Sequence, residues 1–274
     1  MFRPVACKSL AWAPEECQRL PVLRFAQSPG SIRPMPHEQM DEKEVAAYLH
    51  MDVREVAKLA SRGRIPCRKI AGRFCFHKGE LDHWVESQMD TLGKERLEGI
   101  ERGVTRHHGF DAQSMLVCGL IPPAGLAVPL KARTRDAVIR RLVDLADGLD
   151  LVYCREELLA EVRAREELCT TAMVPGVALP HPRHPLPHDI AASFIVVGRT
   201  SSGICYGAAD GSLTRLFFLI CCKDDRTHLH VLARLARMIY DPATIEELLQ
   251  APGEEPLRST LQRLEKKAIQ EAEG

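Results

Sequence analysis

Two stretches in the second half of the chain carry apolar residues at helical spacing, residues 135–145 and 156–168. Residues 190–197 and 213–222 are short apolar runs bounded by glycines, and residues 228–240 and 244–249 return to helical spacing. Short apolar runs of this kind predict buried strands. Helices that interleave with such strands predict an α/β domain in which helices cover both faces of a mixed sheet.

Closer to the N-terminus the pattern predicts two short helices across a tight break. Asp41 can cap a helix over residues 42–49, and three residues later a second helix begins, over residues 53–61. Gly63 can end this second helix. Two short helices joined in this way are typical of a helix-turn-helix.

The next residues predict a β-hairpin and a closing helix. Strands over residues 65–70 and 73–77 are joined by the turn Ala71-Gly72. Leu81, Trp84 and Val85 then follow at helical spacing and can complete a small core. The hairpin would form a wing, so residues 37–89 are predicted to be a small winged helix-turn-helix domain.

These patterns divide the chain into four parts. Residues 1–36 contain six prolines and little periodicity, which predicts an irregular leader. Residues 90–112 are rich in charge and predict a linker that is partly helical. The α/β domain is expected over residues 113–268.

Composition excludes several classes of protein. The chain of 274 residues has 37 basic and 37 acidic side chains, so any nucleic-acid contact must come from a local patch. The apolar runs are too short to cross a bilayer and the N-terminus lacks a continuous apolar stretch, so we expect a cytoplasmic protein without membrane insertion. The ten cysteines form no CxxC pair. A set of Cys67, Cys75, His77 and His83 matches no common zinc spacing, so we predict neither a metal nor a cofactor.

One histidine follows a short apolar run and a proline, in Gly176-Val177-Ala178-Leu179-Pro180-His181. Pro180 can end the strand, so that the imidazole is presented at a strand edge or loop. A neutral imidazole nitrogen is a good nucleophile toward a phosphoryl group. Hydrogen-bond donors for that group can come from Arg165, Thr170, Thr171 and His228.

This arrangement resembles the enzyme IIA domains of the fructose, mannitol and nitrogen-regulatory branches of the bacterial phosphotransferase system. The matching elements, over roughly residues 113 to 265, are the run from Arg165 to Thr171, the Gly176–His181 segment, and His228-Leu229-His230-Val231-Leu232-Ala233. The resemblance implies that His181 accepts phosphate from a histidine phosphocarrier protein, that His228 assists by hydrogen bonding, and that Arg165 and Thr171 steady the charge. Cys169, Ala172, Val174 and Pro182 depart from the family pattern, which usually has glycines in these places.

Two other interpretations of the histidines stay open. His181 could be an ordinary surface-loop histidine, or could belong to a degenerate domain that keeps only the fold. His184 and His188 could bind a metal, but they alternate with prolines and are expected in an exposed turn.

Residues 38–86 resemble the excisionase-type winged helix-turn-helix, which is similar to that of the mercury-resistance regulators. The resemblance rests on residues such as Val45, Leu49, Ile65-Pro66, Gly72-Arg73 and Trp84, most of them core or turn positions. Basic residues crowd the second helix and the hairpin, and we predict that they contact double-stranded DNA: Arg54, Lys58, Arg62, Arg64, Lys69 and Arg73, with Arg68 and Lys78 nearby. The alternative is a solvated face of a small interaction domain. A single module of this kind reads DNA weakly, so a homodimer is expected.

The two halves together predict a regulator in which phosphorylation of His181 changes the binding of DNA or of a partner protein. A plain phosphocarrier for sugar uptake is a competing hypothesis. A transcription factor that has lost phosphorylation and uses the IIA fold only for assembly is another.

Overall fold

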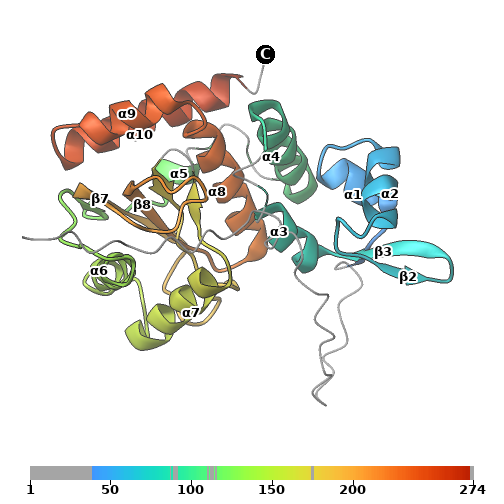
Figure 1. Ribbon diagram of the computed structural model, residues 1–274, viewed down its shortest axis with the longest axis horizontal. Helices are drawn as coiled ribbons and strands as arrows, with labels where there is room; N and C mark the ends of the chain where they lie inside the picture. The colour runs from blue at the N-terminus through green and yellow to red at the C-terminus, as the bar shows by residue number, and fades with distance from the viewer. Residues whose placement is uncertain are drawn as a thin grey trace, which may run out of the picture. The chain divides into compact units, whose positions relative to one another are not determined.

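The computed structural model describes residues 39–86, 88, 92–109, 111, 114, 116–173 and 176–271 (Figure 1). All of them belong to one compact unit, Pro36–Gly274. The leader predicted over residues 1–36 lies outside the described residues.

The N-terminal part contains the two predicted helices. Asp41 caps α1 (Glu42–Tyr48) by accepting hydrogen bonds from the backbone of Lys43 and Glu44, and the Glu44 carboxylate accepts one from the backbone N–H of Asp41. This reciprocal pair satisfies backbone donors that the first turn of a helix leaves without partners. Asp52 caps α2 (Val53–Ser61) in the same manner through the backbone N–H of Arg54.

The wing is a hairpin of β2 (Arg68–Ile70) and β3 (Arg73–His77). Its two-residue turn has positive φ at Ala71 (49°) and Gly72 (83°), as hairpin turns that match the twist of the strands require. β1 (Gln39–Met40), which the sequence analysis did not predict, adds a third strand beside β3.

Helix α3 (Lys78–Glu86) closes the small core that these elements share. Leu81 and Val85 are fully buried against this core. The Tyr48 hydroxyl donates to Asp82 at 2.7 Å, Lys78 lies 2.5 Å from the same carboxylate, and the Trp84 indole donates to the carbonyl of Arg64 at 2.8 Å. Lys78 is thus committed to an ion pair inside the module.

The C-terminal part is a five-stranded mixed sheet in the order β4-β7-β8-β6-β5. β7 (Phe194–Ile204) and β8 (Thr214–Cys221) form its antiparallel centre. β4 (Leu126–Ala127) runs parallel to β7, β6 (Val177–Ala178) runs parallel to β8, and β5 (Ala172–Met173) pairs with β6 in the antiparallel sense.

Side chains alternate across this sheet and divide the core in two. Leu216, Phe218 and Ile220 belong to the cluster that contains residues of α8 (Asp225–Met238), α9 (Pro242–Gln250) and α10 (Glu254–Glu271). Phe217, Leu219 and Cys221 belong to the cluster formed with α6 (Arg135–Asp147) and α7 (Arg155–Leu168). Figure 1 shows α6 and α7 on one face of the sheet and α8 to α10 on the other. The predicted fold class is therefore confirmed.

Several boundaries differ from those expected. β7 begins at Phe194 rather than at residue 190 and continues through Gly198 and Gly203, which the sequence analysis placed outside the strand. A Cβ atom on Gly198 would lie 2.7 Å from the Leu130 side chain, so this glycine marks close packing and not a strand end. Helix α10 and the short α5 (Leu116–Gly119) were not predicted.

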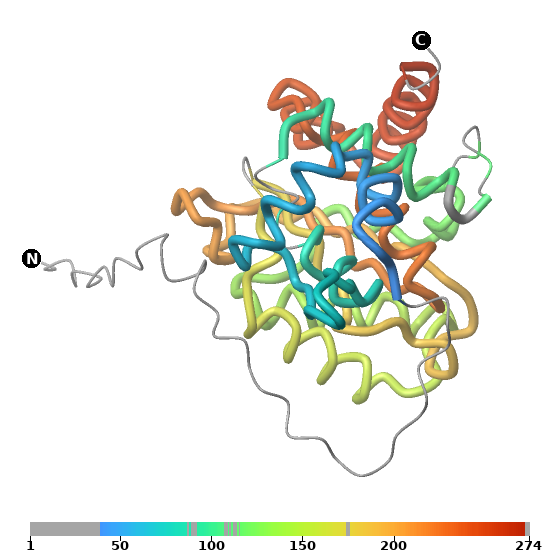
Figure 2. Tube along the Cα trace, turned by 90° about the vertical axis from the view of Figure 1, so that its right-hand side faces the viewer, coloured from blue at the N-terminus to red at the C-terminus, as the bar shows by residue number. Residues whose placement is uncertain are grey.

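The segment expected to be a charged linker contains α4 (Lys94–His108), one face of which is buried. Leu97, Ile100 and Val104 on that face belong to the same apolar cluster as the winged module and α8. Figures 1 and 2 both show α4 between α1 and α8. The two parts therefore share one continuous core through this helix.

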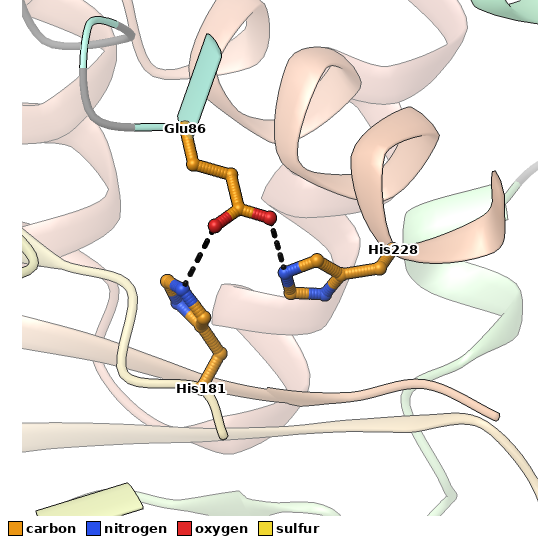
Figure 3. Close-up of side chains that lie close together, drawn as sticks. All are labelled: Glu86, His181 and His228. Carbon is orange, nitrogen blue, oxygen red and sulfur yellow. Dashed lines mark ion pairs between the residues drawn. The ribbon is translucent and has the colours of Figure 1, made fainter. Parts of the chain in front are cut away.

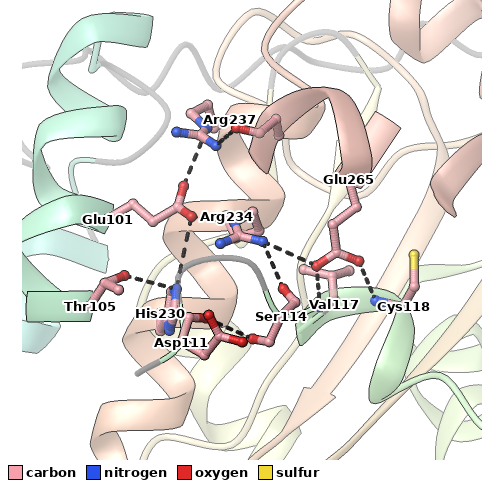
Figure 4. A network of polar contacts seen from close by, with 11 residues as sticks. Glu101, Thr105, Asp111, Ser114, Val117, Cys118, His230, Arg234, Arg237 and Glu265 are labelled. Atoms are coloured by element: carbon pink, nitrogen blue, oxygen red, sulfur yellow. Dashed lines mark hydrogen bonds and ion pairs between the residues drawn. The ribbon is translucent and has the colours of Figure 1, made fainter. Parts of the chain in front are cut away.

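Buried charges also hold α4 to α8 (Figure 4). Glu101 of α4 accepts a hydrogen bond from Arg234, and its other carboxylate oxygen lies 3.2 Å from Nε of Arg237. Glu265 of α10 lies 3.4 Å from Arg234 and accepts from the backbone of Val117 and Cys118. None of the helices in the described residues is long and apolar enough to span a membrane.

We expect Glu101→Ala to lower the free energy of unfolding by about 3–5 kcal/mol, because it leaves buried guanidinium charge uncompensated. Glu98→Ala on the same helix is the matched control, since among the ion pairs of the described residues Glu98 has only the exposed Arg102 as a partner, and the change should cost less than about 1 kcal/mol. Urea denaturation measures both values. Equal decreases in the free energy of unfolding of the two variants would contradict a larger contribution from the buried ion pair.

Candidate functional site

His181 lies directly beyond β6, held between its two neighbours in the sheet. The Leu179 backbone donates to the carbonyl of Thr171 at 3.1 Å, and the Ile220 backbone donates to the carbonyl of Pro180 at 2.9 Å. These bonds continue the sheet past the end of β6 and leave the imidazole at the carboxyl end of the strand. The strand position predicted for His181 agrees with this placement.

The partners of the ring define its tautomer. Nδ1 lies 2.7 Å from the carbonyl oxygen of Leu179, which can only accept, so this nitrogen carries the proton. Nε2 accepts a hydrogen bond from Nε of Arg165 at 3.1 Å and therefore holds the lone pair. The nucleophilic atom of His181 is Nε2.

Arg165 is fixed in the last turn of α7. Its side chain is buried and also donates to the carbonyl of Cys169 at 3.0 Å. A guanidinium group held in this way can stabilise negative charge that develops on a group bound to Nε2.

His228 faces His181 from the first turn of α8, with ring centroids 5.0 Å apart and planes inclined by 56°. The sequence predicted this histidine as the first residue of the helix. The helix instead begins at Asp225, and the backbone N–H of His228 donates to the carbonyl of Asp224. The imidazole ring is thus the part of His228 that reaches the site.

A fourth side chain enters the site from the winged module. Glu86, at the end of α3, places Oε1 3.1 Å from Nε2 of His228 and Oε2 3.7 Å from Nε2 of His181 (Figure 3). The sequence analysis did not identify Glu86. No motif in the sequence marks this glutamate among the others, because its two partners in the site are 95 and 142 residues away. Within its own helix, Oε2 of Glu86 also lies 3.3 Å from Nδ1 of His83.

The protonation states of His181, His228 and Glu86 depend on one another. Burial by itself lowers the pKa of His228, but the carboxylate of Glu86 and the neighbouring Cys222 outweigh it and raise this pKa to about 10. Burial favours protonation of Glu86, yet the His228 charge and hydrogen bonds from His228 and His83 hold the pKa of this carboxyl well below its usual range. Burial lowers the pKa of His181, against the opposing effect of Glu86. At neutral pH the site holds a neutral His181 beside an ion pair of Glu86 and His228.

The acceptor ring is covered and not open at the edge of the sheet. His181 is 3% exposed, and the Glu86 side chain that lies over it is 8% exposed. The ring lies at the end of the strand, as predicted, but it is buried there because α3 packs against α8 beside it.

Thr171 supports the site indirectly. Its hydroxyl donates to Glu166 at 2.6 Å and its backbone N–H donates to the same carboxylate at 2.9 Å. These bonds fix the loop between α7 and β5. The structure thus places Thr171 as an anchor of the loop, whereas the sequence analysis expected its hydroxyl to steady the phosphoryl charge.

Glu86, His181 and His228 offer ligand atoms within 4.8 Å of one another, so the group could hold a metal ion. The Arg165 cation beside Nε2 and the proton on His228 oppose a second positive charge. The same two groups favour an anion. His184 and His188 lie exposed in a bend and a turn, as the sequence predicts.

The residues predicted to contact DNA lie exposed along α2 and the wing: Arg54, Lys58, Arg62, Arg64, Lys69 and Arg73. Arg68 is also exposed and lies 3.4 Å from Glu80. Exposed basic side chains therefore lie on α2, directly after it, and on the wing.

Fold and site together define an α/β domain with a histidine pair at the end of a sheet strand, joined to a helix-turn-helix. The family model described as phosphoenolpyruvate-dependent sugar phosphotransferase system, EIIA 2 matches residues 123–264, and a helix-turn-helix domain model matches residues 40–89. The first match covers more than half of the chain, so the protein belongs to this EIIA family. The resemblance predicted from the sequence is confirmed.

Among its relatives, the chain is 29% identical over 150 residues to the nitrogen regulatory protein of Bradyrhizobium diazoefficiens, covering 54% of this chain and 95% of that protein. It is 24% identical over 145 residues to the fructose-specific EIIABC component of Bacillus subtilis, covering 52% of this chain but only 22% of that much longer relative. The chain is also similar to the crystal structure of nitrogen regulatory protein IIA-Ntr from Neisseria meningitidis, with 21% sequence identity and a TM-score of 0.49. This match covers 53% of this chain and 99% of the Neisseria chain.

We expect an NMR titration of the His228 ring to give a pKa of about 10, and a lower value in Glu86→Gln, because the amide lacks the negative charge. Glu80→Gln, on the exposed side of the same helix, is the control and should leave the pKa of His228 unchanged.

The stability of the ion pair follows the same titration. Because the pKa of His228 is raised on folding, the ion pair contributes its full stability below pH 6.5, the usual pKa of histidine. This contribution is lost as the pH rises toward the folded-state pKa of about 10. The difference in free energy of unfolding between the wild type and Glu86→Gln should therefore shrink over this range. A constant difference would contradict the ion pair.

Proposed function

We propose that this protein is a phosphoryl-accepting regulator of the phosphotransferase system, phosphorylated on His181 and linking that state to DNA or partner binding. The observation that carries the proposal is the tautomer of His181. Its Nε2 lone pair accepts a hydrogen bond from Arg165, while the Leu179 carbonyl holds the proton on Nδ1.

The reaction requires no cofactor. The Nε2 lone pair attacks phosphorus on the phosphohistidine of a histidine phosphocarrier protein, the new N–P bond forms, and the old N–P bond breaks with its electron pair left on the donor imidazole. Nδ1 keeps its proton against the Leu179 carbonyl. The cationic side chains of Arg165 and His228 offset the charge of the phosphoryl group.

Regulation is favoured over sugar transport by the helix-turn-helix domain with its exposed basic face. The similarity to a nitrogen regulatory protein over 95% of that relative supports the same choice. A phosphocarrier for sugar uptake remains the alternative function, since the fructose and mannitol IIA components are also relatives. A domain that has lost phosphorylation is distinguished from both by the labelling experiment below.

We expect the purified chain to acquire label from a phosphorylated histidine phosphocarrier, and His181→Ala to acquire none. His228→Gln should be labelled at least about tenfold more slowly, because it removes one of the groups that stabilise the transferring charge. His188→Ala, in the exposed turn, is the control for loss of a histidine without effect. Undiminished labelling of His181→Ala would exclude this residue as the acceptor.

We expect Lys58→Ala and Arg62→Ala to weaken binding to a random-sequence duplex and to reduce the slope of log affinity against log salt by about 1 each. Lys266→Ala, exposed on α10, is the control and should not change the slope. Fluorescence anisotropy at several salt concentrations measures both quantities, and sedimentation of the same samples tests for the proposed dimer. Equal slopes in all variants would reject α2 as the DNA-contacting helix.

A further inference from the structure

The Glu86 carboxylate lies beside the atom of His181 on which a phosphoryl group would form. Its oxygens lie 3.1 Å from Nε2 of His228 and 3.7 Å from Nε2 of His181, the nitrogen that also accepts from Arg165. Carboxylates and phosphoryl groups both present oxygen acceptors with negative charge to such donors. The pocket formed by Arg165, His181 and His228 therefore already holds an anion, the Glu86 carboxylate of the same chain.

Occupation by Glu86 and phosphorylation exclude each other. A phosphoryl group carries about −1.5 to −2 charges at pH 7, and its oxygens would lie against a carboxylate that is almost fully buried. Two buried like charges within a few ångströms of each other repel strongly. Either Glu86 leaves the pocket or the phosphoryl group does not form.

The position of Glu86 connects this event to the winged module. Two residues before it, Trp84 donates to the carbonyl of Arg64, which follows α2 on the basic face. Four residues before it, Asp82 holds Tyr48 of α1 and Lys78. A movement of the end of α3 therefore acts on groups that position α1 and the residues next to α2.

Helix α4 is held differently and does not need to move. Its Glu101 is paired with two buried arginines of α8, and its apolar face is part of the continuous core. The contact between α3 and α8 is smaller, with Glu86 as its charged element. The change is therefore expected in α3 and not in the whole N-terminal part.

We propose that Glu86 is an intramolecular ligand of the phosphoacceptor pocket, which closes His181 in the unphosphorylated chain and is expelled from the pocket by phosphorylation. Closure of the pocket follows from the contacts alone. The expulsion of Glu86 by phosphorylation of His181 rests on the proposed function. Because coupling is reciprocal, any ligand that draws α3 away from α8 also opens His181 to its phosphoryl donor.

The test compares the full-length wild type with Glu86→Ala, Glu86→Gln and the control Glu80→Ala. Glu80 lies on the same helix but is paired only with the exposed Arg68 in the ion pairs of the described residues. Two rates are measured: modification of His181 by diethyl pyrocarbonate, located by mass spectrometry, and phosphoryl transfer from the phosphorylated histidine phosphocarrier. Circular dichroism confirms that each variant is folded.

Glu86→Ala should raise the modification rate of His181 about 10- to 1000-fold, because a minor open state typically has a population of ~0.1–10%. Glu86→Gln, which keeps the size but not the charge, should give a smaller increase, and Glu80→Ala none. Phosphoryl transfer should accelerate in the same order. An unchanged modification rate in both Glu86 variants, each folded, overturns the proposal.

The remaining outcomes separate the two proposals and the metal alternative. Faster modification without phosphoryl transfer in any variant supports closure by Glu86 and rejects the proposed phosphoacceptor function. A chelator should leave the wild-type modification rate unchanged. If the chelator exposes His181 as Glu86→Ala does, a bound metal ion closes the pocket, and the carboxylate proposal is overturned.

Discussion

The chemistry of this protein depends on how one imidazole ring is held. The Leu179 carbonyl takes the proton of Nδ1, and the Arg165 guanidinium meets the lone pair of Nε2. A ring oriented by only one of these partners could turn or change tautomer, and the lone pair would then no longer lie among the positive groups. The bonds that continue the sheet beyond β6 fix the backbone from which this ring projects. The geometry of the sheet is thus transmitted directly to a nucleophile.

The surroundings of the ring form an anion pocket whose charge is balanced within the chain. His228 is protonated because Glu86 faces it, and Glu86 is ionised because His228 faces it. Removing either partner would leave a buried charge without compensation, which is more costly than the pair itself. A phosphoryl group could replace the carboxylate in the same role. The pocket therefore distinguishes two states of the chain by which anion it contains.

The connection between the two modules has a strong and a weak part. The apolar face of α4 and the pairing of Glu101 with the α8 arginines form the strong part, which belongs to the core. The end of α3 forms the weak part, where one carboxylate provides the charged contact. A switch requires an element that can leave its place without unfolding the rest of the molecule. The proposed switch assigns this role to the end of α3, which lies in the module that carries the exposed basic residues.

The sequence by itself determined the local features of this protein and the class of both modules. Caps at Asp41 and Asp52, the two-residue turn at Ala71-Gly72, and the apolar periodicity of α6 and α7 follow from interactions between near neighbours in the chain. The phosphoacceptor motif was also visible, because His181, Arg165 and His228 stand at spacings known from the EIIA family. Only the tertiary structure decided that Glu86 enters the pocket, that Gly198 lies inside a strand against Leu130, and that the presumed linker is a packed helix. Each of these depends on contacts between residues far apart in the chain, and such contacts leave no periodic or local pattern in a single sequence.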